Sequence, residues 1–581
     1  MAHGASAPPR PGIQRWLWIF SVAAAVICLL ASYAGFWRIS DEETPWKILE
    51  PFYSSGEMLL LHVPHESLAQ AGAHSRALLA LHVARIFAVL SAATLAVALI
   101  LRFLGNWMLR CWRGVRGRHT IICGFGPIAR QLLLEFKKDR PVVIDHRVEH
   151  TEVQEVEAWA ALLEGNPASA GALSAANAAK ASHLFAVTDD DGANVGIAVQ
   201  AIQLAGSKPP QPHVLVHITD PQLRASLRQH AVFASECGGP RVTMFNVFEN
   251  SARLLFLRPN HQLDYVRIGE DDPRAVQLVV IGFGLMGEAL VTRAAMVGHF
   301  ANLKQPRIVV IDKSAMRKQR IFRARYPHFD RVVDAHFLEL DAEEPVTQER
   351  IGELCADAEK TISTVAITFD NDTRGLSLAW SLLDRVRPDV PIRLRLSEHL
   401  GLRDLKLPER ITVFGSMHDA CSREHWLNDE LNRMARALHE YHRRSVHESG
   451  RATPDDRSLR DWDSLADDLI DSNRQAADHI WVKLRAAGCH AIRKGQPDPG
   501  PIVKEFRPEE VERLAKMEHQ RWMAERYLAG WEWAEKKNTP NRKSPYLVPW
   551  EQLDDETAQW DRDFAEILPG LLDNAGWEIH R

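Results

Sequence analysis

Residues 278–287 read Leu-Val-Val-Ile-Gly-Phe-Gly-Leu-Met-Gly, a short apolar strand that runs into the pattern G-x-G-x-x-G. Such glycines allow a tight turn and a close approach of the backbone to a pyrophosphate, and the following helix directs free N–H groups at it. The next apolar strand, residues 307–311, precedes Asp312, whose carboxylate can accept hydrogen bonds from ribose hydroxyls. The stretch predicts a nucleotide-binding parallel sheet with four candidate residues: Gly282, Gly284, Gly287 and Asp312.

The same pattern occurs earlier in the chain, at residues 120–137. A short strand leads into Gly-Phe-Gly-Pro-Ile-Ala at residues 124–129, and a second strand, residues 141–144, precedes an aspartate. This is the G-x-G-x-x-A form of the same fingerprint, with its acidic residue about 20 positions later. It adds Gly124, Gly126, Ala129 and Asp145 to the candidate residues.

Two further segments support an internal duplication. HLFAVTDDDGANVGIA (183–198) and TVAITFDNDTRGLSLA (364–379) each predict a strand, an acidic loop and a helix. The second copy differs by HFANLKQPR (299–307), which is inserted between its first helix and second strand. The sequence therefore predicts an α/β fold with two tandem Rossmann-like parallel sheets.

The N-terminal part of the chain predicts two transmembrane helices, at residues 16–37 and 83–104. Each apolar run is long enough for a bilayer core, and tryptophans mark both ends of the first. Five arginines between residues 102 and 118 follow the second run, whereas the loop between the runs is acidic. The positive-inside rule then places both termini and the bulk of the chain in the cytosol, below an inner (plasma) membrane.

The loop between these helices contains the apolar and aromatic segment 44–64, broken by Ser-Ser-Gly at residues 54–56. One interpretation is a re-entrant pore helix and loop, and the other is an amphipathic helix on the outer surface. The segment has no TVGYG-like sequence, so a potassium-type carbonyl filter is not indicated. A two-helix hairpin cannot enclose a pore alone, so transport would require a homo-oligomer.

Composition excludes several classes of function. The chain has 581 residues, enough for about four domains. Its formal charge of −5 gives no net positive potential that would attract nucleic acid. Its seven cysteines contain no C-x-x-C pair, and His439, Glu440 and His442 lack the spacing of a metal-binding H-E-x-x-H helix. No G-x-S-x-G elbow or P-loop occurs, so we expect neither a metal site nor an enzyme.

The run from GFGPIARQLL through LLEGNPAS to AVTDDDGANVGIAVQA resembles the RCK domain, also called the TrkA N-terminal domain. The resemblance covers residues 118–255 well and 276–400 more loosely. It implies nucleotide-dependent regulation of potassium channels and transporters. It also carries the family's site positions onto Asp189 and Asn194, with Asp370 as a counterpart in the second copy. Gly165-Asn166 departs from the family's frequent Gly-Asp, which leaves occupancy of the first copy in doubt.

Either sheet could instead serve only as a dimerisation scaffold. If a nucleotide binds, Asp145 and Asp312 favour an unphosphorylated ribose, hence NAD(H), ADP or ATP before NADP.

The C-terminal part of the chain is rich in tryptophan, with eight of 17 after residue 460. The segments 472–488, 514–538, 546–553 and 561–576 resemble the RyR domain, the repeat of ryanodine receptors. The resemblance implies a small-ligand or partner site. In one interpretation, arginines there bind phosphate and tryptophans stack on a nucleotide base. In the other, the tryptophans are part of the core and the arginines form ion pairs within the protein. The candidate ligand residues are Glu518, Arg521, Trp522, Trp531 and Arg562.

These predictions combine into one domain order: a membrane hairpin at 1–117, RCK domains at 118–255 and 276–400, a helical linker at 401–455 and a RyR domain at 456–581. The first functional hypothesis is a nucleotide-regulated membrane ion channel or transport regulator for potassium or another monovalent cation, tetrameric by analogy. The second is a non-conducting, membrane-anchored nucleotide sensor or defence effector. A membrane-tethered NAD-dependent oxidoreductase has less support, because no catalytic domain follows either fingerprint.

Overall fold

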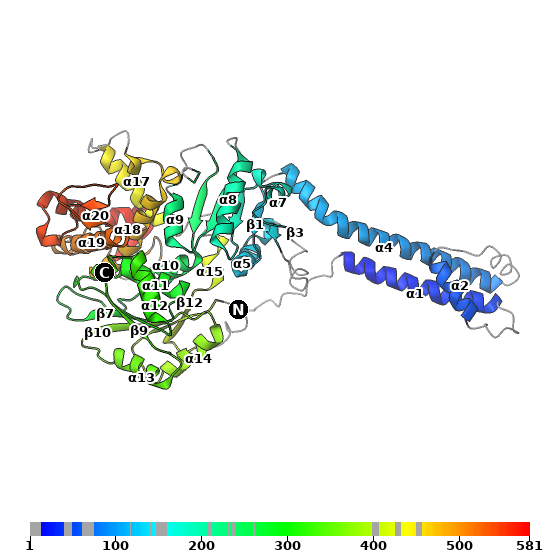
Figure 1. The fold of residues 1–581 in the computed structure, drawn as a ribbon, viewed down its shortest axis with the longest axis horizontal. Coiled ribbons are helices and arrows are strands. Elements are labelled where there is room, and N and C mark those ends of the chain that lie inside the picture. Colours follow the sequence, from blue (N-terminus) through cyan, green and yellow to red (C-terminus); the bar gives the residue numbers. More distant parts are fainter. Residues whose placement is uncertain are drawn as a thin grey trace. The chain divides into compact units, whose positions relative to one another are not determined.

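The structure is a computed structural model that forms two compact units, Met1–Gly117 and Arg118–Arg581, described here separately (Figure 1). It describes residues 13–39, 49–60, 75–116, 118–139, 141–146, 160–206, 211–228, 230, 232–233, 239–258, 262–397, 406–423, 432–448, 456–498 and 500–581.

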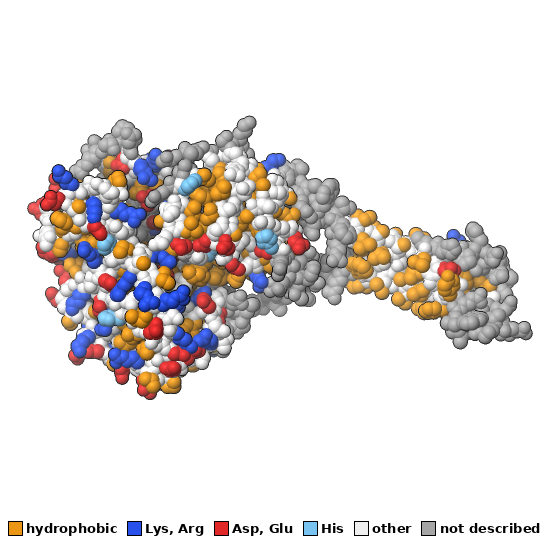
Figure 2. Space-filling view, viewed as in Figure 1, with side chains coloured by type: hydrophobic (Ala, Val, Ile, Leu, Met, Phe, Trp, Pro, Cys, Tyr) orange, Lys and Arg blue, Asp and Glu red, His pale blue; other side chains and the backbone are white. Residues whose placement is uncertain are grey.

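The first unit is a helical hairpin of α1 (Ile13–Ile39) and α4 (Ser75–Arg116) with the short helix α2 (Leu49–Leu59). Two segments, Leu17–Ile39 and Arg76–Ile100, are long and apolar enough to cross a membrane. Apolar side chains also face outward along the hairpin, where Figure 2 shows a largely hydrophobic surface. These features fit the predicted pair of spans.

Small residues allow α1 and α4 to pack closely. Ala24 and Cys28 on α1 and Ala84 and Ala88 on α4 are buried. The hydroxyls of Ser21 and Ser91 each donate to the other residue's carbonyl oxygen at 3.1 Å. Small residues and interhelical hydrogen bonds of this kind hold helices together in lipid, where hydrophobic attraction between them is weak.

Helix α2 packs against α1 and α4, with Met58 buried and Phe52 and Tyr53 exposed. The helix lies within the segment for which a re-entrant pore helix or a surface helix is predicted. The remainder of that segment, apart from Leu60, lies outside the described residues.

The second unit contains two six-stranded parallel sheets, as predicted. The first has the order β3-β2-β1-β4-β5-β6 and the second the order β9-β8-β7-β10-β11-β12, so strand order reverses beside β1 and beside β7. Their strands are β1 (Thr120–Cys123), β2 (Val142–Asp145), β3 (Ala161–Glu164), β4 (His183–Ala186), β5 (His213–His217), β6 (Val242–Phe245), β7 (Ala275–Ile281), β8 (Arg307–Asp312), β9 (Asp334–Glu339), β10 (Thr361–Ile367), β11 (Ile392–Arg395) and β12 (Ile411–Phe414).

Continuous apolar runs explain the central strands, which are buried on both faces as parallel strands require. In the second sheet, Val280 of β7 pairs with Val310 on one side and Ala366 on the other, and all three are buried. The sheet also includes β12, in the segment that the sequence analysis assigned to a helical linker from residue 401. The second sheet therefore extends beyond the predicted boundary at residue 400.

Helices connect these strands and cover the sheets. They are α5 (Pro127–Glu135), α7 (Ala170–Ala175), α8 (Asp191–Ala205), α9 (Pro221–Arg228) and α10 (Val247–Leu257) in the first half, and α11 (Leu285–Val297), α12 (Ala315–Arg325), α13 (Pro345–Leu354), α14 (Asp372–Leu382) and α15 (Met417–Ala420) in the second. The repeated acidic loops supply helix caps: Asp190 accepts from the Ala193 amide and Asn371 from the Arg374 amide.

The two sheets are joined by helices that follow their last strands. Helix α10, after β6, packs against α11 of the second sheet. Helix α15, after β12, packs against α5 of the first sheet and against α10. Each half thus contacts the first helix of the other half, which is the helix that begins at the glycine turn.

The C-terminal region is mostly helical, with α17 (Arg433–Glu448), α18 (Asp467–Ala486), α19 (Pro508–Leu528) and α20 (Asp555–Asn574). It shares one continuous hydrophobic core with the second sheet. The insertion at residues 299–307 lies at this junction: the carbonyl of His299 accepts from Nε2 of His479 at 2.9 Å, and that of Leu303 accepts from the Gln520 amide at 2.9 Å. The insertion therefore attaches the C-terminal region to the second sheet.

Candidate nucleotide-binding sites

The second glycine turn has the geometry that its sequence predicts. It lies at the carboxyl end of β7, where strand order reverses, which is the ligand crevice of open parallel sheets. Gly282 has φ of +92°, a conformation that favours glycine. A Cβ at Gly287 would lie far inside van der Waals contact with the Gly282 carbonyl oxygen, so glycine there lets the helix approach the turn.

Gly284 is the N-cap of α11 and has an ordinary extended conformation, with φ of −85°. A Cβ there would have its nearest protein neighbour, a carboxylate oxygen of Asp370, at 3.9 Å. The space in front of Gly284 is therefore open, next to the free N–H groups at the start of the helix. This is the opening into which a pyrophosphate would fit.

Asp312 lies at the end of β8 and supports the turn directly. Its carboxylate accepts hydrogen bonds from the backbone amides of Phe283 and Ser314, each at 2.8 Å, and from Lys318 Nζ at 2.7 Å. Burial raises the pKa of this carboxyl, but the Lys318 ammonium and the two amides outweigh that effect and hold its pKa below the ordinary value. Asp312 is therefore an ionised acceptor beside the turn.

The first glycine turn has a similar backbone with different surroundings. Gly124 has φ of +114°, and a Cβ there would lie 2.9 Å from the Val187 carbonyl oxygen. Gly126 is the N-cap of α5, and a Cβ there would lie 3.2 Å from a carboxylate oxygen of Asp189. The third position is Ala129, which is fully buried. Asp145 ends β2, at the position that Asp312 has in β8.

Asn194 has a structural role that the sequence did not indicate. Its side-chain amide donates to the carbonyl oxygens of Thr188 and His217, and its oxygen accepts from the amide and hydroxyl of Thr188. These four hydrogen bonds use the full capacity of the side chain, which is fully buried. Asn194 therefore fixes the loop that carries Asp189, and it has no donor or acceptor left for a ligand.

The two crevices differ in charge. In the second copy, Asp370 forms an ion pair with Arg395, at the end of β11. The corresponding residue at the end of β5 is His217, whose pKa burial lowers to about 4, so that it is neutral at physiological pH. Among the described residues, no cation therefore takes the place beside Asp189 that Arg395 has beside Asp370 in the second copy. The second crevice is the more favourable one for a phosphate.

Two of the predicted RyR ligand residues lie in the protein interior. Glu518 forms ion pairs with Lys483 at 2.7 Å and with Arg521 at 2.7 Å, and Arg521 also pairs with Glu525 at 2.7 Å. All four side chains are buried. Arg521 therefore has its guanidinium neutralised by two carboxylates, and the pair supports the structural alternative for these two residues.

The other three RyR candidates are only partly buried. The guanidinium of Arg526 lies 5.5 Å from the ring centre of Trp522 and 5.1 Å from that of Trp531, so one cation contacts both rings. Arg562 pairs with Glu512 at 2.7 Å and lies over Trp550. A ligand site at Trp522, Trp531 and Arg562 stays a prediction.

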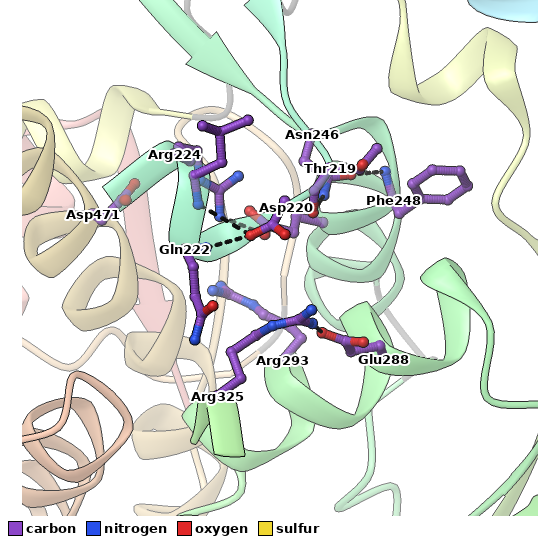
Figure 3. A network of polar contacts seen from close by, with 12 residues as sticks. Thr219, Asp220, Gln222, Arg224, Asn246, Phe248, Glu288, Arg293, Arg325 and Asp471 are labelled. Atoms are coloured by element: carbon purple, nitrogen blue, oxygen red, sulfur yellow. Dashed lines mark hydrogen bonds and ion pairs between the residues drawn. The ribbon is translucent and has the colours of Figure 1, made fainter. Parts of the chain in front are cut away.

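The second unit contains a cavity of about 530 Å³ that no sequence motif predicts. Its walls come from β6, α9 and α10 of the first half, from α11 and α12 of the second, and from α17 and α18. Figure 3 shows Arg224 on one wall, with Arg293 and Arg325 opposite. These residues belong to no sequence motif and are far apart in the chain. The only signal in the sequence is an abundance of arginine in segments without an assigned role.

Comparison with known proteins supports two of the domains. Residues 120–234 match the model of the TrkA-N domain, and residues 503–581 match that of the RyR domain. The second sheet lies outside both matches. Among curated proteins, none matches the chain.

Solved structures give similarity at low identity. GsuK bound to ADP is 17% identical, with a TM-score of 0.38, over 72% of this chain and 100% of that one. The GsuK channel bound to NAD is 13% identical, with a TM-score of 0.37, over 86% of this chain and 90% of that one. The human SLO3 gating ring is 11% identical, with a TM-score of 0.36, over 54% and 84%. By its family matches, the chain contains a TrkA-N domain built on the first glycine turn and a RyR domain at its C-terminal end.

Proposed function

We propose that this protein is a nucleotide-regulated membrane protein that controls ion transport, and that its principal nucleotide site is the second glycine turn. One observation carries the proposal: Gly284 leaves an open space at the N-terminus of α11, beside the ionised carboxylate of Asp312 and at the point where strand order reverses. The match to the TrkA-N model and the two apolar helices support the regulatory and membrane parts.

The packing of the second unit gives a bound nucleotide a route to other parts of the protein. Helix α11, which would bind the phosphates at its N-terminus, packs against α10 of the first half and against α18 and α19 of the C-terminal region. A nucleotide regulates only if it binds two conformations of this assembly with different affinities, and a coupling of about 1–3 kcal/mol per site is typical. A cytosolic ring of several copies, four by analogy, would multiply that coupling at a pore in an inner (plasma) membrane.

Two other functions remain as alternatives. A non-conducting nucleotide sensor or defence effector would use the same site without ion flux. An oxidoreductase would need an acid–base residue positioned at the nicotinamide, and the sequence shows no catalytic domain after either turn. We therefore propose a regulatory nucleotide and no enzymatic activity.

Reconstitution of the full chain in liposomes tests the proposal. We expect potassium or sodium flux that changes when NADH or ADP is added, and we expect the Gly284→Ala variant to lose this response. Oxidation of NADH would instead support the oxidoreductase. Nucleotide binding with neither flux nor oxidation would support the sensor and contradict transport.

The carboxylate of Asp312 predicts discrimination between dinucleotides. The 2′-phosphate of NADPH would lie close to this carboxylate and be repelled by its negative charge. We therefore expect the full chain to bind NADH at least about tenfold more tightly than NADPH, equivalent to about 1.4 kcal/mol. Titration calorimetry measures both affinities. Asp312→Asn keeps an acceptor for the Phe283 amide and removes the charge, so its preference for NADH should be smaller. Tighter binding of NADPH by the natural chain would show that the assignment of Asp312 is wrong.

A further inference from the structure

The cavity described above lies where three parts of the second unit meet. Helices α9 and α10 contribute Arg224, Arg228 and Arg253. Helices α11 and α12 contribute Arg293 and Arg325, and α18 contributes Arg474. Figure 3 shows Arg224 and Asp220 on one side, with Arg293 and Arg325 next to Glu288 on the other. None of the candidate glycines or aspartates of the two turns lines the cavity, although Leu285 of the second turn does. The cavity therefore adjoins the second predicted nucleotide site but does not include its candidate residues.

Among the residues that the structure describes, the lining carries more positive than negative charge: eight arginines line the cavity, against five aspartates and glutamates. The two histidines of the lining add no charge, because burial lowers the pKa of His213 to about 3 and also lowers that of His183. One further carboxylate, Asp478, lies behind the wall and pairs with two of the arginines. Even with Asp478 included, the arginines outnumber the carboxylates in the described part of the wall.

Part of this excess is deeply buried. Asp478 is shared by Arg253, which donates to it at 2.6 and 2.9 Å, and by Arg293. All three side chains are at least nine-tenths buried. Two guanidiniums thus face one carboxylate. Burial, together with the neighbouring Arg253, lowers the pKa of Arg293 below the ordinary arginine value. The Nε of Arg293 has no hydrogen-bond partner among the described residues.

A second pair of guanidiniums shares another carboxylate. Arg228 and Arg474 both contact Asp471, at 2.7 and 3.0 Å. Arg224 pairs with Glu249 at 2.5 Å, and Arg325 pairs with Glu288. Burial raises the pKa of Glu288 although Arg325 opposes this effect, so the carboxylate is poorly stabilised where it lies. Each of these carboxylates accepts from guanidinium N–H groups. The same N–H groups would bind phosphate oxygens in the same geometry.

The dimensions and the remaining lining indicate the size of molecule that the cavity can hold. A volume of about 530 Å³ lies within the range of small-molecule sites. At one end, Trp462 lies under the guanidinium of Arg436, 5.2 Å from its ring centre, and Tyr326 is also part of the wall. The site therefore combines several guanidiniums with aromatic rings.

We propose that this cavity binds a small phosphorylated molecule of nucleotide size, whose phosphates contact Arg224, Arg293 and Arg325. Such a ligand neutralises the excess guanidinium charge. It also connects the first half of the unit, the second half and the helices of the C-terminal region. Its binding would then stabilise one arrangement of these three parts.

Calorimetric titration of the full chain with pyrophosphate, in detergent at low salt, tests the proposal. We expect saturable binding that weakens as salt increases. Arg224→Gln and Arg325→Gln, on opposite walls, should each weaken it about tenfold, as expected for loss of one charge-assisted contact worth about 1.4 kcal/mol. The control Arg387→Gln removes a similarly paired arginine outside the lining and should have no effect.

Glu249→Gln keeps the test valid if the arginine variants do not fold. The Glu249 side chain is 41% exposed, so the substitution should not unfold the protein. It removes one negative charge from the wall, so pyrophosphate should bind more tightly. A parallel titration of Gly284→Ala, which should not bind nucleotide at the glycine turn, with ADP and adenosine identifies the source: ADP tighter than pyrophosphate indicates a nucleotide, and equal affinity indicates another phosphorylated compound. No binding of pyrophosphate, or equal binding by all the variants, would overturn the proposal. Gly284→Ala should leave pyrophosphate binding in the cavity unchanged. A failure of the cavity proposal can therefore be distinguished from a failure of the proposed glycine-turn site.

Discussion

Replacing Gly287 with alanine is expected to destabilise the second sheet by about 3 kcal/mol, whereas the same change at Gly284 should leave stability unchanged and remove nucleotide binding. At Gly287 the added methyl group would overlap the backbone carbonyl oxygen of Gly282. That oxygen cannot move without opening the turn. Asp312 holds the turn through the Phe283 amide, and the Thr368 hydroxyl donates to the Gly282 carbonyl oxygen itself at 2.6 Å.

At Gly284 the added methyl group meets no protein atom closer than 3.9 Å, and the backbone conformation suits alanine. The methyl group occupies only the space that the pyrophosphate needs. We therefore expect the folded variant to bind NADH or ADP at least about tenfold more weakly. Both variants add one methyl group, at positions that are three residues apart. Each variant is therefore a control for the other.

Unfolding followed by tryptophan fluorescence, together with calorimetry of nucleotide binding, distinguishes the two effects. If Gly284→Ala binds nucleotide as tightly as the natural chain, the second turn is a scaffold and the proposed site is wrong. If Gly287→Ala is as stable as the natural chain, the close approach of α11 to the turn does not contribute to stability.

Local sequence patterns predict the local parts of this fold well. Gly124 and Gly282 both adopt the positive φ that favours glycine, and the apolar strands that precede them are buried as expected. The insertion at 299–307 is visible in the sequence as extra length. Its role as the attachment point for His479 and Gln520 is not, because those partners lie more than 170 residues away.

Residue type alone does not distinguish a ligand-binding role from a structural one at two of the candidate residues. Asn194 and Arg521 have side chains that commonly bind ligands, but neighbouring groups use their full hydrogen-bonding capacity or neutralise their charge. The arginine-rich cavity was missed for the opposite reason. Its residues have no common spacing, and only the packing of α10 against α11 brings Arg253 and Arg293 to the same carboxylate.

The buried ion pairs of the C-terminal region lead to a second large effect. Replacing Glu518 with leucine should destabilise the protein by about 3–5 kcal/mol, because it removes the carboxylate that neutralises Lys483. Lys483 is 0% exposed. Burial lowers its pKa while Glu518 opposes that effect, and its ammonium also donates to Nδ1 of His479, which is itself bonded to His299. Loss of Glu518 would thus weaken the attachment of the C-terminal region to the second sheet.

The double variant Lys483→Met with Glu518→Leu removes both charges together and should recover most of the lost stability, since apolar replacements of a buried pair are often neutral. The exposed pair Lys494–Asp573 provides a matched control, with the same 2.7 Å separation and side chains 44% and 61% exposed. Asp573→Leu should cost less than about 1 kcal/mol. Equal destabilisation by Glu518→Leu and by the double variant would show that packing, not the unpaired ammonium, sets the cost. Because Arg521 keeps Glu525 in both variants, the comparison isolates Lys483.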